Sequence, residues 1–409
     1  MAEPSGVSGR ILADAARSIG VIAAGAGTLD GELDRAVPEY RRALAHLLLN
    51  FFKHRRFLDG ELARLAPRTP PARIGNLLRA ALTQIYFQRS IAAASAVNIA
   101  VDTAGRRHSG FVNAVLRRAV AERRIPPEKP EEVFPEVVLT RWRERFPAEV
   151  LNGFAAALLA EPEFTFRSER GMVPPPSWQA EPISAAGGFE FYTMAEPERL
   201  FAGEEFRRGV CYVQDPTAAL APSLLPVTDG QRALRALDMC AAPGGKALML
   251  LERLNDGTQL VLADRSAARQ RQTRENFARR GLLGRVEIVV EDGTNPAGVI
   301  SGDFQVVLLD VPCSNTGVFR RRPDALWRFS VPELRRTVEL QRRLLERAAG
   351  LTAPGGVLIY STCSIELEEN SGQVHDFVAR HPEFVIECEQ ELLPGREHDG
   401  AFASRLRRQ

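Results

Sequence analysis

Apolar residues recur at spacings of three and four along the first 125 residues of the chain. Residues 43–52 form one strongly apolar run, and residues 74–88 and 93–104 repeat apolar side chains at helical spacing. Residues 111–116 continue the pattern up to an arginine pair at positions 117 and 118. No convincing alternation of apolar and polar residues interrupts these segments, so the pattern predicts an all-α bundle.

Beyond residue 233 the pattern changes to short apolar runs that alternate with helical segments. It predicts strands at residues 234–238, 259–264, 286–291, 304–310 and 356–361, and helices at residues 246–254, 267–280, 331–349 and 366–380. The unbroken apolar run at residues 306–309 is typical of a strand that is covered on both faces. We therefore predict an α/β fold, a Rossmann-like doubly wound sheet of mostly parallel strands, with ligands at the carboxyl ends of the strands.

A charged, proline-rich segment at residues 125–132 is typical of a linker between domains. We accordingly place a helical domain at residues 1–128 and the α/β domain at residues 226–409. For the region between them, residues 135–225, the sequence predicts one or two helices around residues 139–159, followed by weak strands.

Composition and charge narrow the class of protein. The net charge of the 409 residues is only +2, but residues 1–125 contain 19 Lys and Arg against 10 Asp and Glu, which favours contact with a polyanion. The longest early uncharged run has 12 residues, whereas a bilayer span takes about 20. The five cysteines include no CxxC pair and no zinc-site spacing. We expect a cytoplasmic protein with reduced thiols, no metal and no membrane partner.

A turn of small residues follows the first predicted strand of the α/β domain. It consists of Cys240, Ala241, Ala242, Pro243, Gly244, Gly245 and Lys246. Small residues let backbone amides approach a ligand closely. A P-loop requires glycine at position 240 and Ser or Thr at position 247, and a dinucleotide site requires G-x-G-x-x-G, so both alternatives fail. The turn therefore favours a nucleoside cofactor with a methionine-like tail.

Three aspartates end successive predicted strands. Asp264 closes the second strand, 20 residues beyond Gly244, where an acid accepts hydrogen bonds from ribose hydroxyls. Asp292 ends the third strand, in a position suited to an adenine amino group, and Asp310 ends the fourth. The three aspartates and the small-residue turn together predict one cofactor site.

Two cysteines follow the fourth and fifth predicted strands, whose ends are neighbours in a doubly wound sheet. Cys313 lies shortly after Asp310, and Cys363 follows the last strand. Cytosine C5 is a poor nucleophile, but a thiolate that adds to C6 makes C5 reactive toward a sulfonium methyl group. This chemistry needs a thiolate, an acid that holds N3 and a methyl donor, as well as a base that has left its stack. The residues alone scarcely indicate which of the two thiols attacks the base.

These motifs together resemble the NOL1/NOP2/Sun family of RNA cytosine-5 methyltransferases. The resemblance continues to the end of the chain through residues 392–394 and 399–402. The helical module is similar to NusB-like RNA-binding domains through residues 96–98 and 110–118. This pairing resembles the bacterial small-subunit ribosomal RNA methyltransferase B group, and we expect a monomer that acts on 16S ribosomal RNA.

The resemblance implies S-adenosyl-L-methionine as cofactor, bound by residues 240–246 and by Asp264, Asp292 and Asp310. It also implies that Cys363 is the nucleophile and that Cys313 assists product release. Two segments depart from the family's pattern. Residues 315 and 316 are Asn-Thr where many members carry Gly, and residues 161–168 fit only loosely a segment that usually reads Pro-Pro-x-x-x-Arg-Val-Asn.

An arginine-rich segment follows the Cys313 motif. Residues 317–347 contain nine arginines and four acids. We expect Arg320, Arg321 and Arg322 to contact RNA phosphates, and Trp327 to stack on a base.

Two other functions remain to be weighed against methylation. One is a non-catalytic RNA-binding or ribosome-assembly factor that keeps the fold, which the intact turn, the three aspartates and both cysteines disfavour. The other is a nicotinamide dehydrogenase, which the missing glycine fingerprint disfavours. Cofactor binding followed by methyl transfer to ribosomal RNA separates these functions from methylation.

Overall fold

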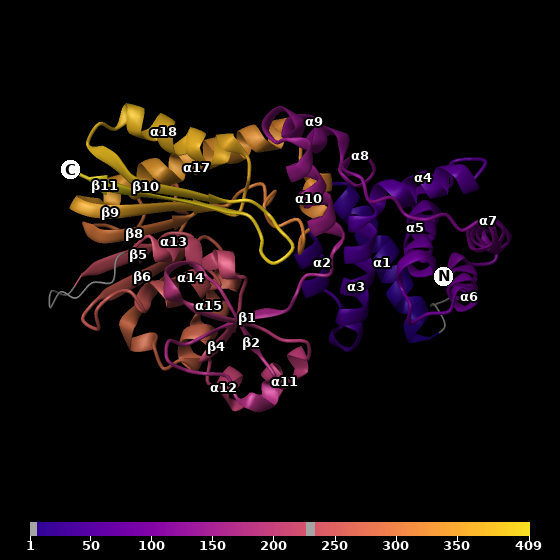
Figure 1. The fold of residues 1–409 in the computed structure, drawn as a ribbon, viewed down its shortest axis with the longest axis horizontal. Helices are drawn as coiled ribbons and strands as arrows, with labels where there is room; N and C mark the ends of the chain where they lie inside the picture. Colours follow the sequence, from indigo (N-terminus) through magenta and orange to yellow (C-terminus); the bar gives the residue numbers. More distant parts are fainter. Residues whose placement is uncertain (1–5, 226–233) are drawn as a thin grey trace. The chain divides into compact units, whose positions relative to one another are not determined.

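The computed structural model describes residues 6–225 and 234–409, which form two compact units (Figure 1). The helical unit contains residues up to Ala160 together with Phe319–Ser330, and the α/β unit contains Glu161–Val318 and Val331–Gln409. Within the described ranges, no helix has the length and apolarity that crossing a membrane requires.

The helical unit is built around one central helix. Helix α5 is buried over most of its surface and contacts α1, α3, α4, α6 and α7. This arrangement confirms the predicted helical bundle, because the apolar repeats of each helix face a shared core. The helices of this unit are α1 (Val7–Ala23), α2 (Leu29–Asp34), η1 (Pro38–Tyr40), α3 (Arg41–Lys53), α4 (Arg55–Leu65), α5 (Ala72–Phe87), α6 (Ala93–Ala104), α7 (Ser109–Ala121), α8 (Pro130–Val133), α9 (Glu136–Arg145), α10 (Ala148–Leu159) and α16 (Asp324–Arg328).

The segment Phe319–Ser330 belongs to the helical unit although it follows the Cys313 motif in sequence. The ring of Phe319 is fully buried, with ring centroids 5.8–6.0 Å from those of Phe134, Trp142 and Phe154. The backbone N–H of Leu29 donates to the Asp324 carboxylate at 3.1 Å. Helices α8 to α10, which lie beyond the helical domain predicted at residues 1–128, also belong to this unit.

The α/β unit contains a seven-stranded sheet with the order β10-β11-β9-β8-β5-β6-β7. The five strands from β9 to β7 pair in parallel, while β11 and β10 add an antiparallel edge. This sheet confirms the predicted Rossmann-like fold. Its strands are β5 (Arg235–Asp238), β6 (Gln259–Asp264), β7 (Val286–Val290), β8 (Phe304–Asp310), β9 (Thr352–Thr362), β10 (Phe384–Leu392) and β11 (Ala401–Arg408).

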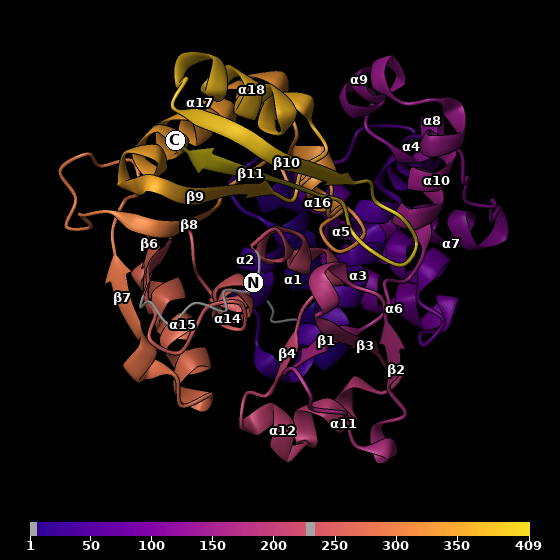
Figure 2. The ribbon, with the colours of Figure 1, turned by 60° about the vertical axis from the view of Figure 1, so that its left-hand side comes forward.

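Helices cover both faces of this sheet (Figures 1 and 2). One apolar core joins alternate strand residues to α17 (Val331–Leu351) and α18 (Ser371–Arg380). A second core joins the intervening strand residues to α14 (Gly245–Leu251) and α15 (Ala267–Arg279). Because successive side chains of a strand point to opposite faces, the unbroken apolar run of β8 supplies both cores.

The sequence analysis missed the edge hairpin of β10 and β11. Strand β10 alternates apolar and acidic residues, and β11 ends in charged ones, so neither has the continuous apolar run of the central strands. Their charges pair across the hairpin: Glu387 of β10 forms ion pairs with Arg405 and Arg407 of β11. Charged side chains are a common feature of exposed sheet edges.

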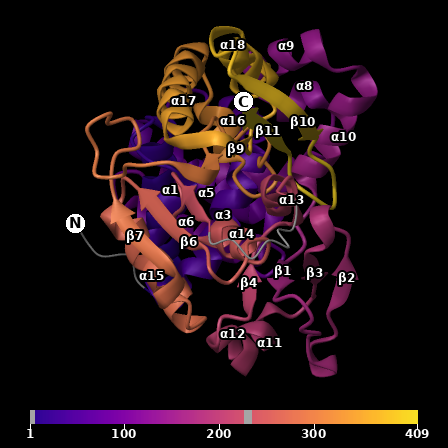
Figure 3. The same cartoon turned by 90° about the vertical axis from the view of Figure 1, so that its left-hand side faces the viewer.

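A small antiparallel sheet with the order β2-β3-β1-β4 precedes the large one in sequence, and α11 (Pro197–Ala202) and α12 (Glu204–Arg207) lie beside it (Figure 3). The loosely matching segment at residues 161–168 ends in its strand β1. Arg167 of β1 is 1% exposed and forms an ion pair with Glu252, which follows α14. This buried pair joins the small sheet to the helix that begins after the small-residue turn. The four strands are β1 (Thr165–Ser168), β2 (Glu181–Ile183), β3 (Glu190–Thr193) and β4 (Cys211–Val213).

Candidate active site

The small-residue turn runs from the end of β5 to the start of α14, and the backbone conformation at its first glycine, Gly244, requires glycine. Gly244 has a φ of 97°, and a Cβ atom there would lie 2.9 Å from the ring of Phe277. A Cβ atom on Gly245 would lie 2.9 Å from the side-chain nitrogen of Gln214. Gly244 is therefore required by this backbone path, whereas at position 245 the end of the flexible Gln214 side chain can move aside.

A cavity of 250 Å³ opens beside this turn. It gathers Lys246, Asp310 and most of the turn. Its lining also includes Asp238, Tyr212, Gln214 and Ala218, which the sequence analysis did not select. The sequence could have identified Asp238 as a site residue, because it ends the first strand of the sheet as Asp264 and Asp310 end theirs. The cavity is lined by Tyr212, Gln214, Ala218, Asp238, Cys240, Ala241, Ala242, Pro243, Gly245, Lys246 and Asp310.

Lys246 and Asp310 form an ion pair in this cavity, with Nζ and Oδ1 2.5 Å apart. Burial disfavours the charged amine, but attraction to Asp310 and the hydrogen bond between them outweigh burial and raise the pKa of Lys246. The Cys363 thiol also contributes to this shift. The lysine is therefore a fixed positive charge within electrostatic reach of one of the two thiols.

Asp238 is 1% exposed at the end of β5. Burial, reinforced by repulsion from Asp310, raises its pKa to about 8. In the folded protein the carboxyl therefore keeps its proton at pH values where the unfolded chain has lost it. The folded state then binds more protons than the unfolded state, so this group makes stability fall as the pH rises from about 4 to about 8.

We expect Asp238→Asn, which has nearly the same shape and no charge, to remove this loss of stability. The melting temperature of the cofactor-free variant should exceed that of the parent protein by less at pH 5 than at pH 8, where the variant should melt several degrees higher. A shift of about 2–4 °C corresponds to 1 kcal/mol in a domain of this size. An equal difference at both pH values would mean that the Asp238 carboxyl does not titrate in this range.

Asp264 and Asp292 do not line the cavity in this structure. Asp264 is 4% exposed, accepts a hydrogen bond from the Ser266 N–H at 2.8 Å and forms an ion pair with Arg269 at 3.2 Å. Arg269 also donates to the carbonyl of Ala242 in the turn. Asp292 is exposed, and hydrogen bonds from the backbone and side chain of Thr294 hold its pKa below the usual range. The sequence analysis missed Arg269, which connects Asp264 to the turn.

The two predicted thiols lie side by side, with the Sγ atoms of Cys313 and Cys363 3.2 Å apart. Strands β8 and β9 pair in parallel, with Asp310 opposite Ser361, which confirms that the two strand ends are neighbours. The hydrogen bond to Cys363, followed by burial, raises the pKa of Cys313 well above its ordinary value. Cys313 is therefore held as a thiol, which is the form that can donate a hydrogen bond.

Asn315 contacts both cysteine residues. Its Oδ1 atom accepts a hydrogen bond from the Cys363 thiol at 3.2 Å, and its Nδ2 atom donates to the Cys313 carbonyl at 2.9 Å. Its φ is 61°, in the left-handed region that Asn tolerates better than most residues and Gly adopts freely. This departure from the family pattern therefore keeps a backbone conformation suited to glycine and adds an amide that joins the Cys363 thiol to the backbone carbonyl of Cys313.

We expect Asn315→Gly to lower turnover at this site about 2- to 10-fold, the effect of losing one hydrogen bond that orients a reacting group. Glycine adopts the same φ without strain, so the substitution removes only the amide. The rate at which iodoacetamide alkylates Cys363, read by peptide mass spectrometry, should change in the same variant. Unchanged turnover and alkylation would show that the amide does not position the thiol.

A buried carboxylate supports the loop that carries Cys313. Glu369 is fully buried and accepts hydrogen bonds from the Ser314 N–H at 2.8 Å and from Gln341 at 3.0 Å. Burial raises its pKa. Gly317 in the same loop donates its N–H to the Cys363 carbonyl, and its own carbonyl accepts from Gly400 of the closing motif. Nothing in the local sequence around Glu369 indicates this role, which arises only when α17, β8 and β9 come together.

The arginines after this loop differ from the prediction. Arg320 is 1% exposed, so it does not present its guanidinium for phosphate contact, contrary to expectation. Arg321 is half-buried, and Arg322 is exposed but pairs with Asp30 at 2.8 Å. The indole N–H of Trp327 donates to the Phe52 carbonyl at 2.8 Å, and the guanidinium of Arg55 lies 4.8 Å from its ring centroid. Trp327, which was predicted to stack on a base, therefore packs within the helical unit, where Arg55 lies over its ring.

Two family models match the chain. The model described as 16S rRNA methyltransferase RsmB/F matches residues 223–406, and the NusB family model matches residues 25–121. Among curated relatives, ribosomal RNA small subunit methyltransferase B of Klebsiella pneumoniae subsp. pneumoniae is 30% identical over 81% of this chain and 80% of its own length. The protein of the same name from Thermus thermophilus is 33% identical over 88% of this chain and 86% of its own length.

Solved structures show the same fold. The crystal structure of PH0851 superposes with a TM-score of 0.77 at 21% identity, covering 97% of this chain and 98% of that one. NSun6 from Pyrococcus horikoshii with SFG superposes with a TM-score of 0.57 at 19% identity, covering 67% of this chain and 98% of that one.

Proposed function

Because the chain belongs to the RsmB/F family of 16S ribosomal RNA methyltransferases, we propose that it methylates C5 of a cytosine in small-subunit ribosomal RNA through a covalent cysteine adduct. The observation that carries this proposal is the pair of thiols 3.2 Å apart, at the ends of adjacent strands and beside the Lys246–Asp310 ion pair. A methyl transfer to oxygen or to an exocyclic nitrogen has no use for two adjacent thiols.

S-adenosylmethionine is the cofactor of the family, and when bound it supplies the methyl group. The residues present fit such a ligand, because Gly244 and Gly245 leave the backbone of the turn without side chains and the cavity beside the turn is open. We assign residues 240–246 and Asp310 to this ligand. We also assign Asp264 to its ribose and Asp292 to its adenine, which requires the Asp264–Arg269 ion pair to open.

Cys363, Asp310 and Lys246 have separate roles in the proposed reaction. The Sγ of Cys363 forms a bond to C6 of the cytosine, and the electron pair of the C5–C6 double bond moves toward C5 while N3 takes up a proton from solvent. The Asp310 carboxylate accepts a hydrogen bond from this N3–H, and the proton is returned to solvent when the bond between Sγ and C6 breaks. The positive charge of Lys246 favours the thiolate form of Cys363. After C5 has gained the methyl group and lost its proton to a base, the bond between Sγ and C6 breaks and the ring double bond re-forms.

The position and protonation of Cys313 suit it to assist release of the methylated product. Its raised pKa keeps it protonated, and its Sγ lies within hydrogen-bonding distance of the sulfur that must leave. A hydrogen bond donated to the departing thiolate of Cys363 stabilises that leaving group. Loss of Cys313 should therefore slow elimination and leave the attack intact.

We expect Asp264→Ala to weaken S-adenosylmethionine binding by about 1–3 kcal/mol, the scale for losing a charged partner of two hydroxyls. Isothermal titration of the purified protein measures this change. Asp256→Ala is the matched control, because Asp256 is an exposed aspartate of the same unit that does not line the cavity. Unchanged affinity in Asp264→Ala would remove this residue from the proposed site.

The proposed function itself is tested by incubating the protein with unmodified small-subunit ribosomal RNA and S-adenosylmethionine, followed by bisulfite sequencing. We expect one cytosine to become protected from conversion. Methyl incorporation without a protected cytosine would contradict the C5 assignment. Cofactor binding without any incorporation would favour a non-catalytic assembly factor.

A further inference from the structure

The small antiparallel sheet supplies one wall of the 250 Å³ cavity beside the small-residue turn. Tyr212 belongs to its strand β4, and Gln214 follows that strand directly. A Cβ atom on Gly245 would lie 2.9 Å from Nε2 of Gln214 and 3.1 Å from Cε1 of Tyr212, so both side chains lie against the start of α14. The proposed reaction gives these two side chains no role, although they share the cavity with Lys246 and Asp310.

The side chain of Gln214 is oriented by Arg167. Nε of Arg167 donates to Oε1 of Gln214, with the two atoms 3.4 Å apart. The guanidinium is fixed in turn by its buried ion pair with Glu252. The backbone of Gln214 is held as well, because its N–H donates to the Thr165 carbonyl at 3.3 Å and its carbonyl accepts from the Thr165 hydroxyl at 2.9 Å. An amide that is bonded through its oxygen presents its nitrogen on the other side, which here is the side of the turn.

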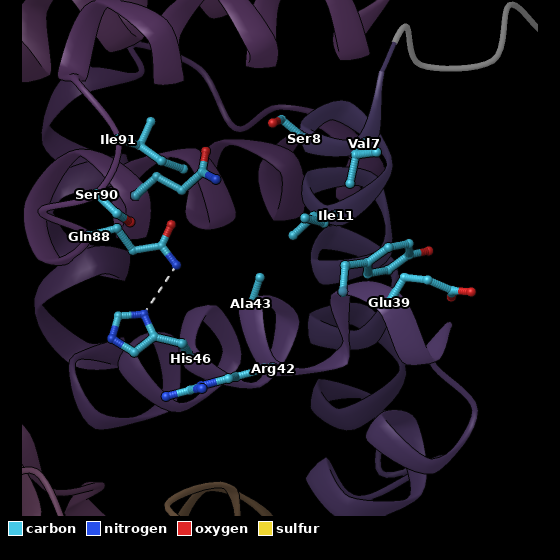
Figure 4. Close-up of a pocket in the computed structure, with 12 residues that line it drawn as sticks. Val7, Ser8, Ile11, Glu39, Arg42, Ala43, His46, Gln88, Ser90 and Ile91 are labelled. Carbon is cyan, nitrogen blue, oxygen red and sulfur yellow. Dashed lines mark hydrogen bonds between the residues drawn. The ribbon is translucent and has the colours of Figure 1, made fainter. Parts of the chain in front are cut away.

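The amide nitrogen of Gln214 is a donor without an acceptor. Its Nε2 atom makes no hydrogen bond within residues 6–225 and 234–409, and the side chain is partly exposed where it lines the cavity. Gln88 of the helical unit differs, because it lines a separate cavity of 720 Å³ in which its Nε2 atom lies 3.3 Å from Nδ1 of His46 (Figure 4). The donor of Gln214 is therefore available to a ligand that enters the cavity beside the turn.

The methionine tail of the cofactor matches the polar groups of this cavity. Asp264 and Asp292, which we assign to the ribose and the adenine, lie outside its lining, so the cavity is left for the tail. The tail carries an ammonium group and a carboxylate. Acidic side chains of the lining suit the ammonium group, but the lysine of the lining, Lys246, is already paired with Asp310 at 2.5 Å. The carboxylate therefore needs a neutral donor, and Gln214 offers one.

We propose that Nε2 of Gln214 donates a hydrogen bond to the carboxylate of the cofactor's methionine tail, and that Arg167 is the positioning residue for this amide. A hydrogen bond to a carboxylate is charge-assisted and therefore stronger than one between neutral groups. The small sheet then selects cofactors whose tail carries a carboxylate. This inference rests on the proposed cofactor site, and not on the target base or on the covalent step.

Isothermal titration of the full chain with S-adenosylmethionine and with decarboxylated S-adenosylmethionine isolates this contact, because the second ligand lacks only the tail carboxylate. Gln214→Met keeps the length of the side chain and removes the donor. We expect this variant to bind S-adenosylmethionine about tenfold more weakly, the lower end of what a hydrogen bond to a charged group contributes. It should bind the decarboxylated ligand as tightly as the parent protein does.

Arg167→Lys tests the positioning role separately. A lysine keeps the ion pair with Glu252, but it lacks the second donor of the guanidinium fork, so the Gln214 amide becomes free to turn. We expect S-adenosylmethionine to bind about threefold more weakly, as for the loss of one neutral hydrogen bond, and the decarboxylated ligand to bind unchanged. A merely structural role of Arg167 would weaken both ligands equally.

Gln390→Met is the matched control, because Gln390 is an exposed glutamine of the edge strand β10 that does not line the cavity. Both affinities should stay at the parent values in this variant. An equal loss of both ligands in Gln214→Met, or an unchanged affinity for S-adenosylmethionine, would overturn the assignment. Retained binding of the decarboxylated ligand shows that the variant is folded. Methylation at a position other than C5 would contradict the proposed function and leave these affinities as they are, so the two failures are distinguishable.

Discussion

Replacement of Cys363 by alanine is expected to abolish methyl transfer and to prevent any covalent complex with RNA. Without a bond to C6, the cytosine ring does not become nucleophilic at C5, so the loss should reach the detection limit, several orders of magnitude in turnover. Incorporation of labelled methyl groups into small-subunit ribosomal RNA measures turnover, and a denaturing gel reports the complex.

Two controls separate this effect from misfolding. Cofactor affinity should stay close to that of the parent protein, because Cys363 does not line the 250 Å³ cavity. Cys388→Ala removes a partly buried thiol from the edge strand β10 and should retain activity. Turnover that persists in Cys363→Ala at the parent rate would exclude this residue as the nucleophile.

Replacement of Cys313 by alanine is expected to have the opposite effect on the covalent complex. The attack by Cys363 and the gain of the methyl group proceed, but the departing sulfur loses the thiol that lies 3.2 Å away. Elimination then becomes the slow step, and a protein–RNA adduct should accumulate as a shifted band in a denaturing gel. Treatment of the band with nuclease should leave a modified nucleotide on the peptide that contains Cys363.

The two variants together test the assignment of roles. An adduct in Cys363→Ala and none in Cys313→Ala would mean that the roles are exchanged. If neither variant forms an adduct and both turn over, covalent catalysis is wrong for this protein. The double variant Cys313→Ala/Cys363→Ala should form no adduct, since the accumulated species depends on attack by Cys363.

Local sequence determined the elements around the proposed active site. The strands 259–264 and 304–310 were predicted to the residue, because each contains an apolar run of four residues followed directly by aspartate. The turn from Cys240 to Lys246 could be located because steric restriction selects glycine at particular positions. The closeness of the two thiols followed from one rule, that parallel neighbouring strands end at the same edge of a sheet.

Tertiary structure alone decided which polar side chains are available to contact a substrate or to support the site. Arg320 and Trp327 looked like RNA contacts, but Phe319–Ser330 packs into the helical unit and buries the arginine. Glu369 and Asn315 acquire their roles only when loops some 50 residues apart in sequence meet, because Glu369 accepts a hydrogen bond from the Ser314 N–H and Asn315 accepts one from the Cys363 thiol. The periodicity of apolar residues indicates which face of a helix or strand is apolar. It does not report which distant segment will cover that face, because that choice depends on packing and hydrogen bonding between residues remote in the chain.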